Sequence, residues 1–244
     1  MKNPKSILIT GASSGIGAAL ATEYAADGVT LYLSGRNEER LNDIKSACAS
    51  KGATVNTKII DVTEKQAMQD WISSIPHLDI VIANAGISSG VGGDIREIFS
   101  TNVDGVFNTV EPALETMKQK GRGQIAIVSS IAGFRGLPSS PAYSASKSAV
   151  KAYGEALRGQ YHDQNIQINV ICPGFVRSHI TDQNNFKMPF FMEADKAAKI
   201  IRAGLSKDKG LITFPWQMKL ITSFVFNLIP EFLLEKILRK LPSK

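Results

Sequence analysis

The chain has few of the residues from which disulfide frameworks and metal centres are built. It contains two cysteines, Cys48 and Cys172, and three histidines that follow no metal-ligand spacing. Two cysteines so far apart do not make the disulfide pattern of a small secreted protein. We therefore expect a reducing compartment and no metal ion.

A membrane-spanning run and a leader segment are also missing. The apolar run 220–230 has eleven uncharged residues, whereas a helix needs about 20 to cross a bilayer. The first strand-like run begins at Ser6, which leaves no room for the apolar region and cleavage site of a signal peptide. There is no internal repeat, low-complexity tract or linker. The sequence predicts a cytoplasmic protein.

Negative charge is not in excess anywhere, and the positive excess is confined to one end. Residues 1–186 carry 17 basic and 17 acidic residues, and residues 187–244 carry 11 and 5, so the net charge of +6 lies in the last 58 residues. This basic segment lies beside an apolar tail and lacks the aromatic-basic pattern that stacks on nucleic acid. We therefore expect no nucleic-acid partner.

The sequence has the alternation of strand-like and helix-like segments that is typical of an α/β protein. The 244 residues are 43% hydrophobic, enough for a large core, and strand-like runs alternate with helix-like segments. The predicted strands are 6–10, 30–34, 55–60, 79–83, 124–129, 167–172 and 210–214. We expect a doubly wound, seven-stranded parallel sheet with helices on both faces, forming a single domain over 1–214. A C-terminal helical extension follows over 215–244.

A glycine-rich turn connects the first predicted strand to the first helix. The run Gly11-Ala-Ser-Ser-Gly-Ile-Gly17 follows residues 6–10 and leads into the helix-like segment 18–26. Such a turn lets backbone N–H groups approach a diphosphate, and the dipole of the helix favours its negative charge. By analogy with the dinucleotide fingerprint, Gly11 permits the turn, Gly15 the close approach and Gly17 helix packing. The spacing differs from that fingerprint, so an ordinary glycine turn is the alternative.

A tyrosine and a lysine four residues apart are the second candidate feature. On a helix, Tyr143 and Lys147 share one face. A free tyrosine ionises near pH ~10, and a neighbouring ammonium lowers that pKa toward the range in which a general acid or base works at neutral pH. We expect this effect at Tyr143. Solvated helices show the same spacing, so the pair alone is weak evidence.

Polar and glycine motifs follow five of the predicted strands. Gly11 comes after the first, Asp61 after the third, Asn84 after the fourth, Ser130 after the fifth and Pro173 after the sixth. Ligands of doubly wound sheets bind beyond the carboxyl ends of the strands. The sequence therefore predicts one binding site at this edge.

Together these motifs resemble the short-chain dehydrogenase/reductase family over about residues 5 to 214. The matching residues, in the family's order, are Thr10-Gly-Ala-Ser-Ser-Gly-Ile-Gly17, Asp61-Val62, Asn84-Ala-Gly86, Asn102, Ser130, Tyr143 with Lys147, and Pro173-Gly-Phe-Val176. The resemblance implies an NAD(P)-dependent oxidoreductase on a Rossmann-type sheet that interconverts a carbonyl and an alcohol. It also implies a homo-dimer or homo-tetramer.

The resemblance implies a catalytic set of four residues. Tyr143 would protonate the carbonyl oxygen or deprotonate the alcohol, and Lys147 would lower its pKa and bind the nicotinamide ribose. Ser130 would orient the substrate oxygen, with Ser129 as the immediate alternative. Asn102 would hold a water in a proton relay behind Lys147, although a lone asparagine in a helix is usually structural.

The resemblance also implies the cofactor contacts. Asp61 and Val62 would frame the adenine, unless Asp61 is a helix N-cap paired with Glu64; the two roles are compatible. Ser178 stands where the family often has threonine and keeps the hydroxyl. The full predicted set is Gly11, Ser13, Ser14, Gly15, Ile16, Gly17, Arg36, Asp61, Val62, Asn84, Ala85, Gly86, Tyr143, Lys147, Pro173, Gly174, Val176 and Ser178.

The end of the second predicted strand indicates which dinucleotide is bound. An NAD site usually carries an acidic residue there to bind the ribose 2′-hydroxyl, but this chain has Gly35 and then Arg36. A guanidinium binds a 2′-phosphate with paired, charge-assisted hydrogen bonds, and Ser13 adds a hydroxyl. We predict that NADP(H) is preferred over NAD(H). The alternative is a solvated Arg36 that pairs with Glu38 or Glu39.

The predicted substrate loop, about 178–195, is rich in apolar residues. They are Phe186, Met188, Pro189, Phe190, Phe191 and Met192. An adaptable apolar surface favours a hydrophobic carbonyl or alcohol over a sugar. The alternative is that these side chains pack the loop onto the core.

The C-terminal extension ends in a basic amphipathic segment. Leu234, Ile237, Leu238 and Leu241 share one face, and Glu235, Lys236, Arg239 and Lys240 share the other. Such a helix suits peripheral contact with an anionic membrane. Covering the substrate cleft or packing on another subunit fits the pattern equally well.

Overall fold

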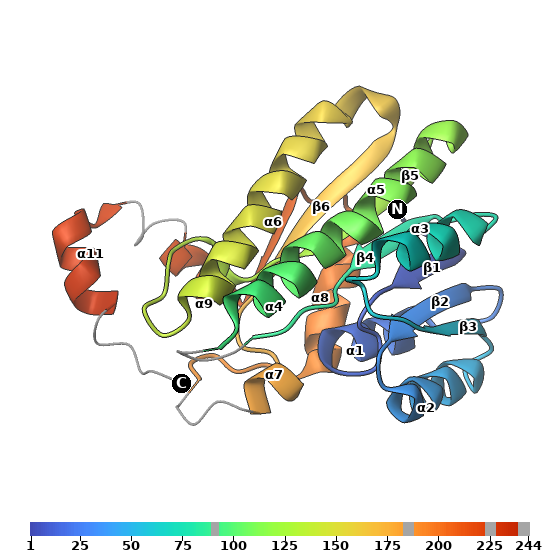
Figure 1. Cartoon of the computed structure of the whole chain (residues 1–244), viewed down its shortest axis with the longest axis horizontal. Helices are drawn as coiled ribbons and strands as arrows, with labels where there is room; N and C mark the ends of the chain where they lie inside the picture. Colours follow the sequence, from blue (N-terminus) through green and yellow to red (C-terminus); the bar gives the residue numbers. More distant parts are fainter. Residues whose placement is uncertain (89–92, 183–187, 223–227, 239–244) are drawn as a thin grey trace.

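The computed structural model describes residues 1–88, 93–182, 188–222 and 228–238. Within them, seven parallel strands form one sheet in the order β3-β2-β1-β4-β5-β6-β7 (Figure 1). The strands are β1 (Ser6–Ile9), β2 (Thr30–Gly35), β3 (Thr54–Ile59), β4 (Ile80–Ala83), β5 (Gly123–Val128), β6 (Ile166–Pro173) and β7 (Leu211–Phe214). No boundary differs from the predicted one by more than one residue, so the predicted sheet is confirmed.

The central strands are buried on both faces, which explains their uninterrupted apolar sequences. Every residue of β1, β4 and β5 is buried. Successive side chains of a strand point to opposite faces. Ile7 and Ile9 therefore belong to one hydrophobic core and Leu8 to the other. At the sheet edge, β3 is largely exposed and has the polar sequence that its position allows.

Helices cover both faces of the sheet (Figure 1). One core contains residues of α1 (Gly15–Tyr24), α2 (Glu38–Ala49) and α8 (Ala194–Ser206). The other contains residues of α3 (Lys65–Ser74), α5 (Gly105–Lys120) and α6 (Pro141–Gln160). The structure is therefore the doubly wound Rossmann-type arrangement that the sequence predicts.

The strand order reverses between β1 and β4, which are neighbours in the sheet. From β1 the chain builds β2 and β3 outward on one side, and from β4 it builds β5, β6 and β7 on the other. The loops that leave β1 and β4 diverge, so a crevice opens at the carboxyl ends of these two strands.

Short helical elements border that crevice. They are α4 (Ile95–Phe99), a π-helix (Ser100–Asp104) between α4 and α5, a 3₁₀ turn (Ile131–Gly133) after β5, and α7 (His179–Asp182) after β6. A further 3₁₀ turn (His162–Gln164) lies at the amino-terminal ends of the strands, directly before β6. Isolated π-turns inside helices are frequent at functional sites.

Among the described residues after the last strand are the helices α9 (Trp216–Leu220) and α11 (Glu231–Leu238), and α11 lies at the periphery of the molecule (Figure 1). Leu234 and Leu238 are buried, in agreement with the predicted apolar face, but Phe232 and Leu233 are 62% and 43% exposed. The predicted positions Arg239, Lys240 and Leu241 lie outside the described residues, as does the Ile237 side chain. No described helix is both long and apolar enough to cross a membrane.

Candidate active site

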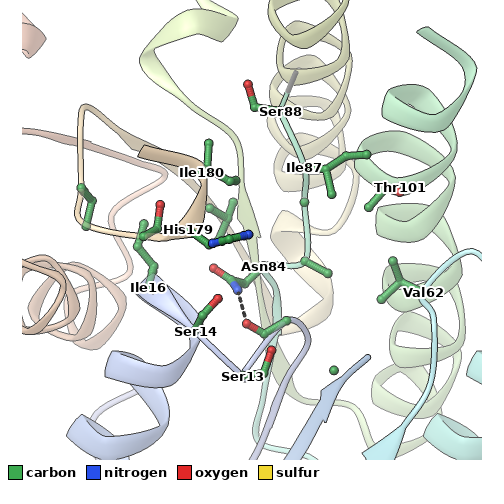
Figure 2. Close-up of a pocket in the computed structure, with 18 of the residues that line it drawn as sticks. Ser13, Ser14, Ile16, Val62, Asn84, Ile87, Ser88, Thr101, His179 and Ile180 are labelled. Atoms are coloured by element: carbon green, nitrogen blue, oxygen red, sulfur yellow. Dashed lines mark hydrogen bonds between the residues drawn. The ribbon is translucent and has the colours of Figure 1, made fainter. Parts of the chain in front are cut away.

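A cleft of about 550 Å³ lies at the carboxyl ends of the strands. It is lined by most of the predicted site residues: Gly11, Ser13, Ser14, Gly15, Ile16, Arg36, Asp61, Val62, Asn84, Ala85, Gly86, Ser130, Tyr143, Lys147, Pro173, Gly174, Val176 and Ser178. The two others, Gly17 and Asn102, lie behind its wall. Figure 2 shows how the glycine turn, the segment after β4 and the start of α7 surround the cavity.

The glycine turn is shaped by close backbone contacts. Gly11 and Gly15 have φ values of +64° and +54°, a region that disfavours side chains. A Cβ on Gly11 would lie 2.8 Å from Ala85 Cα, and one on Gly15 would lie 2.8 Å from Ser178 Cβ. Gly17 packs α1 directly against the Gly11 carbonyl. The close packing leaves no room for side chains at these three positions, and the N-terminus of α1 faces the cleft.

Asn84 fastens the turn to the neighbouring strand. Its side-chain amide donates to the carbonyl oxygens of Thr10 at 2.9 Å and Gly11 at 3.2 Å. Figure 2 shows one hydrogen bond from Asn84 as a dashed line. The Thr10 hydroxyl in turn accepts from the backbone N–H groups of Asn84 and Ala85. The residues after β1 and β4 thus form one rigid unit at the reversal of strand order.

The catalytic candidates meet at the other end of the cleft. Helix α6 places Tyr143 and Lys147 on one face, with Lys147 Nζ 5.8 Å from the centroid of the Tyr143 ring. Ser130 hydrogen-bonds the Tyr143 phenol. The Ser129 hydroxyl instead donates to the backbone oxygen of Lys147 at 2.7 Å. Of the two serines between which the sequence left the choice open, Ser130 is therefore the one that faces Tyr143.

Burial dominates the protonation of this pair. It raises the pKa of Tyr143, although the Ser130 hydrogen bond acts in the opposite direction. It lowers the pKa of Lys147 to about 8. In the chain on its own the net shift of the Tyr143 pKa is therefore upward, opposite to the expected direction, because burial outweighs the effects that favour the phenolate. The Lys147 ammonium donates to the Val128 carbonyl at 3.0 Å. The Tyr143 phenol and the Lys147 ammonium both lose hydration inside the protein, which disfavours the charged form of each.

Asn102 lies in the π-helix and is buried. Its side chain accepts from Ile87 N at 2.8 Å and donates to Ile87 O at 2.9 Å and to Ser146 Oγ at 3.0 Å. A Cβ on Gly86 would lie 3.1 Å from Asn102 Oδ1 and 3.2 Å from Lys147 Nζ. Asn102 thus ties the segment after β4 to α6 immediately behind the lysine.

The far end of the cleft contains an ion pair that the sequence did not reveal. Arg36 Nη1 lies 3.3 Å from Asp61 Oδ2, so Arg36 pairs with this carboxylate rather than with Glu38 or Glu39. Asp61 also accepts from the N–H and hydroxyl of Thr63, at 3.0 and 2.9 Å. Burial would raise the Asp61 pKa, but these hydrogen bonds and the guanidinium outweigh it and hold the pKa below its ordinary value.

The expected helix-capping role of Asp61 is only partly met. Its carboxylate closes the turn at Thr63, while the N-cap position of α3 is occupied by Glu64, which makes no side-chain cap hydrogen bond. The reciprocal box expected between Asp61 and Glu64 is therefore not formed, because α3 begins at Lys65, later than that pattern requires.

The sequence model of the family described as short chain dehydrogenase matches residues 5–188. The chain belongs to the short-chain dehydrogenase family. It is 35% identical over 247 residues to an uncharacterized oxidoreductase of Myxococcus xanthus, and the match covers 97% of each chain. Members of the family are NAD(P)-dependent oxidoreductases that act on CH–OH and C=O groups, and so is this protein.

Two solved structures share the fold of this short-chain dehydrogenase. One is a short-chain dehydrogenase of Sphingobium yanoikuyae in complex with NADPH, with a TM-score of 0.83 and 22% identity, covering 97% of this chain and 96% of the other. The other is a short chain dehydrogenase of Mycobacterium paratuberculosis bound to NAD, with a TM-score of 0.74 and 22% identity, covering 86% and 94%. These two proteins share one fold and bind different dinucleotides.

The cleft of the short-chain dehydrogenase has further lining residues that were not in the predicted catalytic and cofactor-binding set. They are Ser34, Gly35, Asn37, Arg40, Ile60, Ile87, Ser88, Thr101, Val128, Ser129, His179, Ile180 and Thr181. Arg40 follows Arg36 by four residues, and His179 follows the predicted Ser178. Both positions adjoin assigned residues, which is the signal that would have found them.

The substrate loop divides into a packed part and an exposed part. Met192 is buried in one core and pairs with Val176 in an isolated parallel bridge. Phe190 and Phe191 are 46% and 36% exposed. Phe186 lies outside the described residues. Both interpretations of the loop therefore apply. Met192 packs onto the core, and Phe190 and Phe191 form an exposed apolar surface.

Proposed function

We propose that this short-chain dehydrogenase interconverts a hydrophobic carbonyl and its alcohol by hydride transfer with NADP(H), with Tyr143 as the general acid or base. The observation that carries the proposal is that Ser130, Tyr143 and Lys147 meet at one end of a cleft whose middle is the glycine turn and whose far end holds Arg36. The spacing of these features along one cleft suits a dinucleotide with its nicotinamide beside Tyr143.

The residues present fit such a cofactor. The Ser34 hydroxyl is buried in the lining of the cleft and has no hydrogen-bond partner among the described residues. A buried hydroxyl without a partner is costly, so a polar ligand beside it removes that cost. The positive φ values of Gly11 and Gly15 keep the centre of the cleft free of side chains. The predicted cofactor-binding residues that line the cleft would hold the dinucleotide.

When bound, the nicotinamide supplies or accepts the hydride. The Tyr143 phenol donates its proton to the carbonyl oxygen in reduction and takes it back in oxidation. Its raised pKa keeps the phenol protonated at neutral pH, which suits the acid role. Ser130 donates to the same oxygen as charge develops there, and the Lys147 ammonium favours the phenolate that follows.

Asn102 acts as a positioning residue in this proposal. Its three hydrogen bonds fix the backbone at Ile87 and the Ser146 side chain on α6. These contacts hold the lysine-bearing helix against the segment after β4. The proton relay expected behind Lys147 is consistent with this place.

The preference for NADP(H) rests on Arg36, Arg40 and Ser13, which line the same end of the cleft. Arg36 is exposed, and its pair with Asp61 at 3.3 Å is weak enough for a 2′-phosphate to compete for the guanidinium. The solved relative that holds NADPH is consistent with this preference.

The cofactor preference is tested with Arg36→Ala. Loss of a charged hydrogen bond should weaken NADPH by roughly 1.5–3 kcal/mol and NADH far less. Arg122→Ala is the control, because Arg122 contacts His77 away from the cleft. Equal losses for both nucleotides in fluorescence titrations would show that Arg36 does not read the 2′-phosphate.

A hydrophobic substrate is supported by Ile87 and Ile180 in the cleft wall and by the exposed Phe190 and Phe191 in the loop beyond α7. NADPH consumption with a panel of carbonyls, from small sugars to long-chain and polycyclic ketones, tests both parts of the proposal. Turnover should be fastest with the apolar members. No consumption with any member would favour a nucleotide-bound regulator without turnover.

A second candidate role is supported by the C-terminal extension. Trp216, Leu220, Leu228, Phe232 and Leu233 are large apolar residues that are 43–75% exposed. Residues 215–244 carry five basic and two acidic residues, so the extension holds +3 of the net charge of +6. We infer peripheral contact with an anionic membrane, from which an apolar substrate would also enter the cleft.

This contact is tested with the double variant Phe232→Ser and Leu233→Ser. Both side chains are exposed, so the fold should tolerate the change while sedimentation with anionic vesicles falls. Ile59→Ser, which replaces an equally exposed residue on β3, is the control. If vesicle binding is unchanged but light scattering shows a smaller particle, the extension is a subunit contact instead.

A further inference from the structure

His179 occupies a place in the cleft for which neither the sequence nor the family assignment provides a role. It is the first residue of α7 and lines the cleft next to Ser178. Figure 2 shows its imidazole directed into the cavity, toward Asn84 and across from Ser14. The start of α7 lies against the glycine turn, since a Cβ on Gly15 would be 2.8 Å from Ser178 Cβ. The ring therefore faces the N-terminus of α1 across the cleft.

The distribution of charge in the cleft leaves its middle without a permanent cation. Among the described lining residues, Arg36, Arg40 and Asp61 are at one end and Lys147 is at the other. A dinucleotide carries its diphosphate between these ends, at the glycine turn. Backbone N–H groups and a helix dipole supply only partial charge there. In that stretch of the lining, His179 is the side chain that is able to carry a full positive charge.

We propose that His179 binds the diphosphate of the dinucleotide from the side opposite the glycine turn, and that it does so most strongly as the imidazolium. The inference rests on the proposed dinucleotide site. Protonation of the imidazole supplies the full positive charge that this stretch of the cleft lacks, whereas the diphosphate is ionised in either case. Affinity for the dinucleotide should therefore rise as the pH falls from 8 to 6.

Other charged groups near His179 have to be separated from this effect. On α7 itself there is Asp182, and the adjoining Arg177 is paired with Glu193 at 2.7 Å. The groups that face the cleft from the other elements are Tyr143 and Lys147 on α6, Arg36 after β2, Arg40 on α2 and Asp61 after β3. Lys147 also gains charge as the pH falls below about 8. A substitution at position 179 leaves all these groups in place, so the comparison of variants isolates the imidazole.

The test measures dissociation constants by fluorescence titration at pH 6 and pH 8 for the wild type and His179→Gln. NADH is the probe, because the 2′-phosphate of NADPH itself titrates near pH ~6. Glutamine keeps a hydrogen-bonding side chain but has no charge to gain. For each protein, the dissociation constant for NADH at pH 8 is divided by that at pH 6. This ratio should be about three- to tenfold larger for the wild type than for His179→Gln.

Two controls complete the design. His162→Gln removes an exposed histidine beside Asp163, remote from the cleft, and should keep the pH dependence of the wild type. His179→Asn presents its amide at a different distance, and it should lose the pH dependence of NADH binding as His179→Gln does. Thermal melts establish that each variant is folded.

The outcomes separate this inference from the proposed function. If His179→Gln binds NADH with the same pH ratio as the wild type, or is weakened equally at both pH values, the inference is overturned and the dinucleotide site stands. If the wild type binds neither NADH nor NADPH at either pH, the proposed function itself is overturned. A reduced pH ratio in both His179 variants supports the inference.

Discussion

Charged side chains at the amino-terminal ends of the strands, here called the amino-terminal edge, differ from the buried lysine at the carboxyl-terminal ends, the carboxyl-terminal edge. At the amino-terminal edge, Asp208 accepts from Arg158 at 2.8 Å and from Asn169 at 2.9 Å, and Asp79 accepts from the backbone N–H of Lys5 at 2.7 Å. At the carboxyl-terminal edge, the buried Lys147 donates to a backbone carbonyl, and no ion pair with a described carboxylate is formed. Asp79 and Asp208 have their charges satisfied, and so do Arg36 and Asp61 at the far end of the cleft, whereas Lys147 keeps a charge in an environment that disfavours it.

The pKa directions express the same difference. Burial would raise the pKa values of Asp79 and Asp208, but their hydrogen bonds outweigh it and lower both. Ionised forms that are favoured in the folded state add stability above about pH 4, and this is lost as the pH falls through the folded pKa. For Lys147, the lowered pKa means that protonation opposes folding. Asp79 and Asp208 therefore stabilise the protein, whereas Lys147 gives up stability for chemistry.

The largest effect should come from Tyr143→Phe, which removes the proton donor and leaves the ring. We expect kcat to fall by roughly 10²–10⁴-fold while the dissociation constant for NADPH changes little. Tyr153→Phe is the matched control on the same helix, since Tyr153 packs edge-on against Phe107. Activity of Tyr143→Phe within about tenfold of the wild type would refute the assignment.

Lys147→Met should separate activity from stability most clearly. Turnover should be lost, but the variant should be more stable by about 3 kcal/mol at pH 7, because it no longer buries a charge whose pKa is lowered to about 8. The penalty in the wild type fades as the pH rises from about 8 toward the unfolded value, near 10.4. Urea unfolding at pH 7 and pH 10 measures this, and a variant that is less stable at pH 7 would contradict it.

The neighbouring serines should respond differently. Ser130→Ala is expected to lower kcat by about 10²-fold, as for the loss of one hydrogen-bond donor to a developing oxyanion. Ser129→Ala removes the hydroxyl that binds the Lys147 carbonyl, so it should cost about 1 kcal/mol of unfolding free energy. Steady-state kinetics and urea unfolding on both variants decide the matter. The reverse pattern would mean that Ser129 orients the substrate.

Asp208→Asn should give the smallest effect, and it should affect stability alone. The loss of charge-assisted hydrogen bonds to Arg158 should cost about 1–2 kcal/mol at pH 7 without changing kcat or the NADPH dissociation constant. The difference from wild type should shrink below about pH 4, where the aspartate becomes protonated. Urea unfolding from pH 3 to pH 7 tests this, and a change in cofactor binding would show that the two edges are not independent.

Most of the sheet was predictable because its signal is local. Strands such as Ser6–Ile9 and Ile80–Ala83 are short apolar runs with turn residues behind them, and burial on both faces demands such runs. Placing the motifs of the candidate site at one edge needed only the rule that ligands bind at the carboxyl ends of parallel strands. His179 and Arg40 belong to no motif and were missed, although both lie close in sequence to assigned residues.

The sequence by itself determined the order of strands and helices, the glycines of the turn and the helical spacing of Tyr143 and Lys147. Each depends on chain geometry over a few residues. Only the tertiary structure decided that Ser130 rather than Ser129 faces the phenol, and that Arg36 pairs with Asp61. Packing also reversed the expected shift of the Tyr143 pKa. These outcomes depend on which distant segments meet and how much water they exclude, and a one-dimensional pattern carries no record of either.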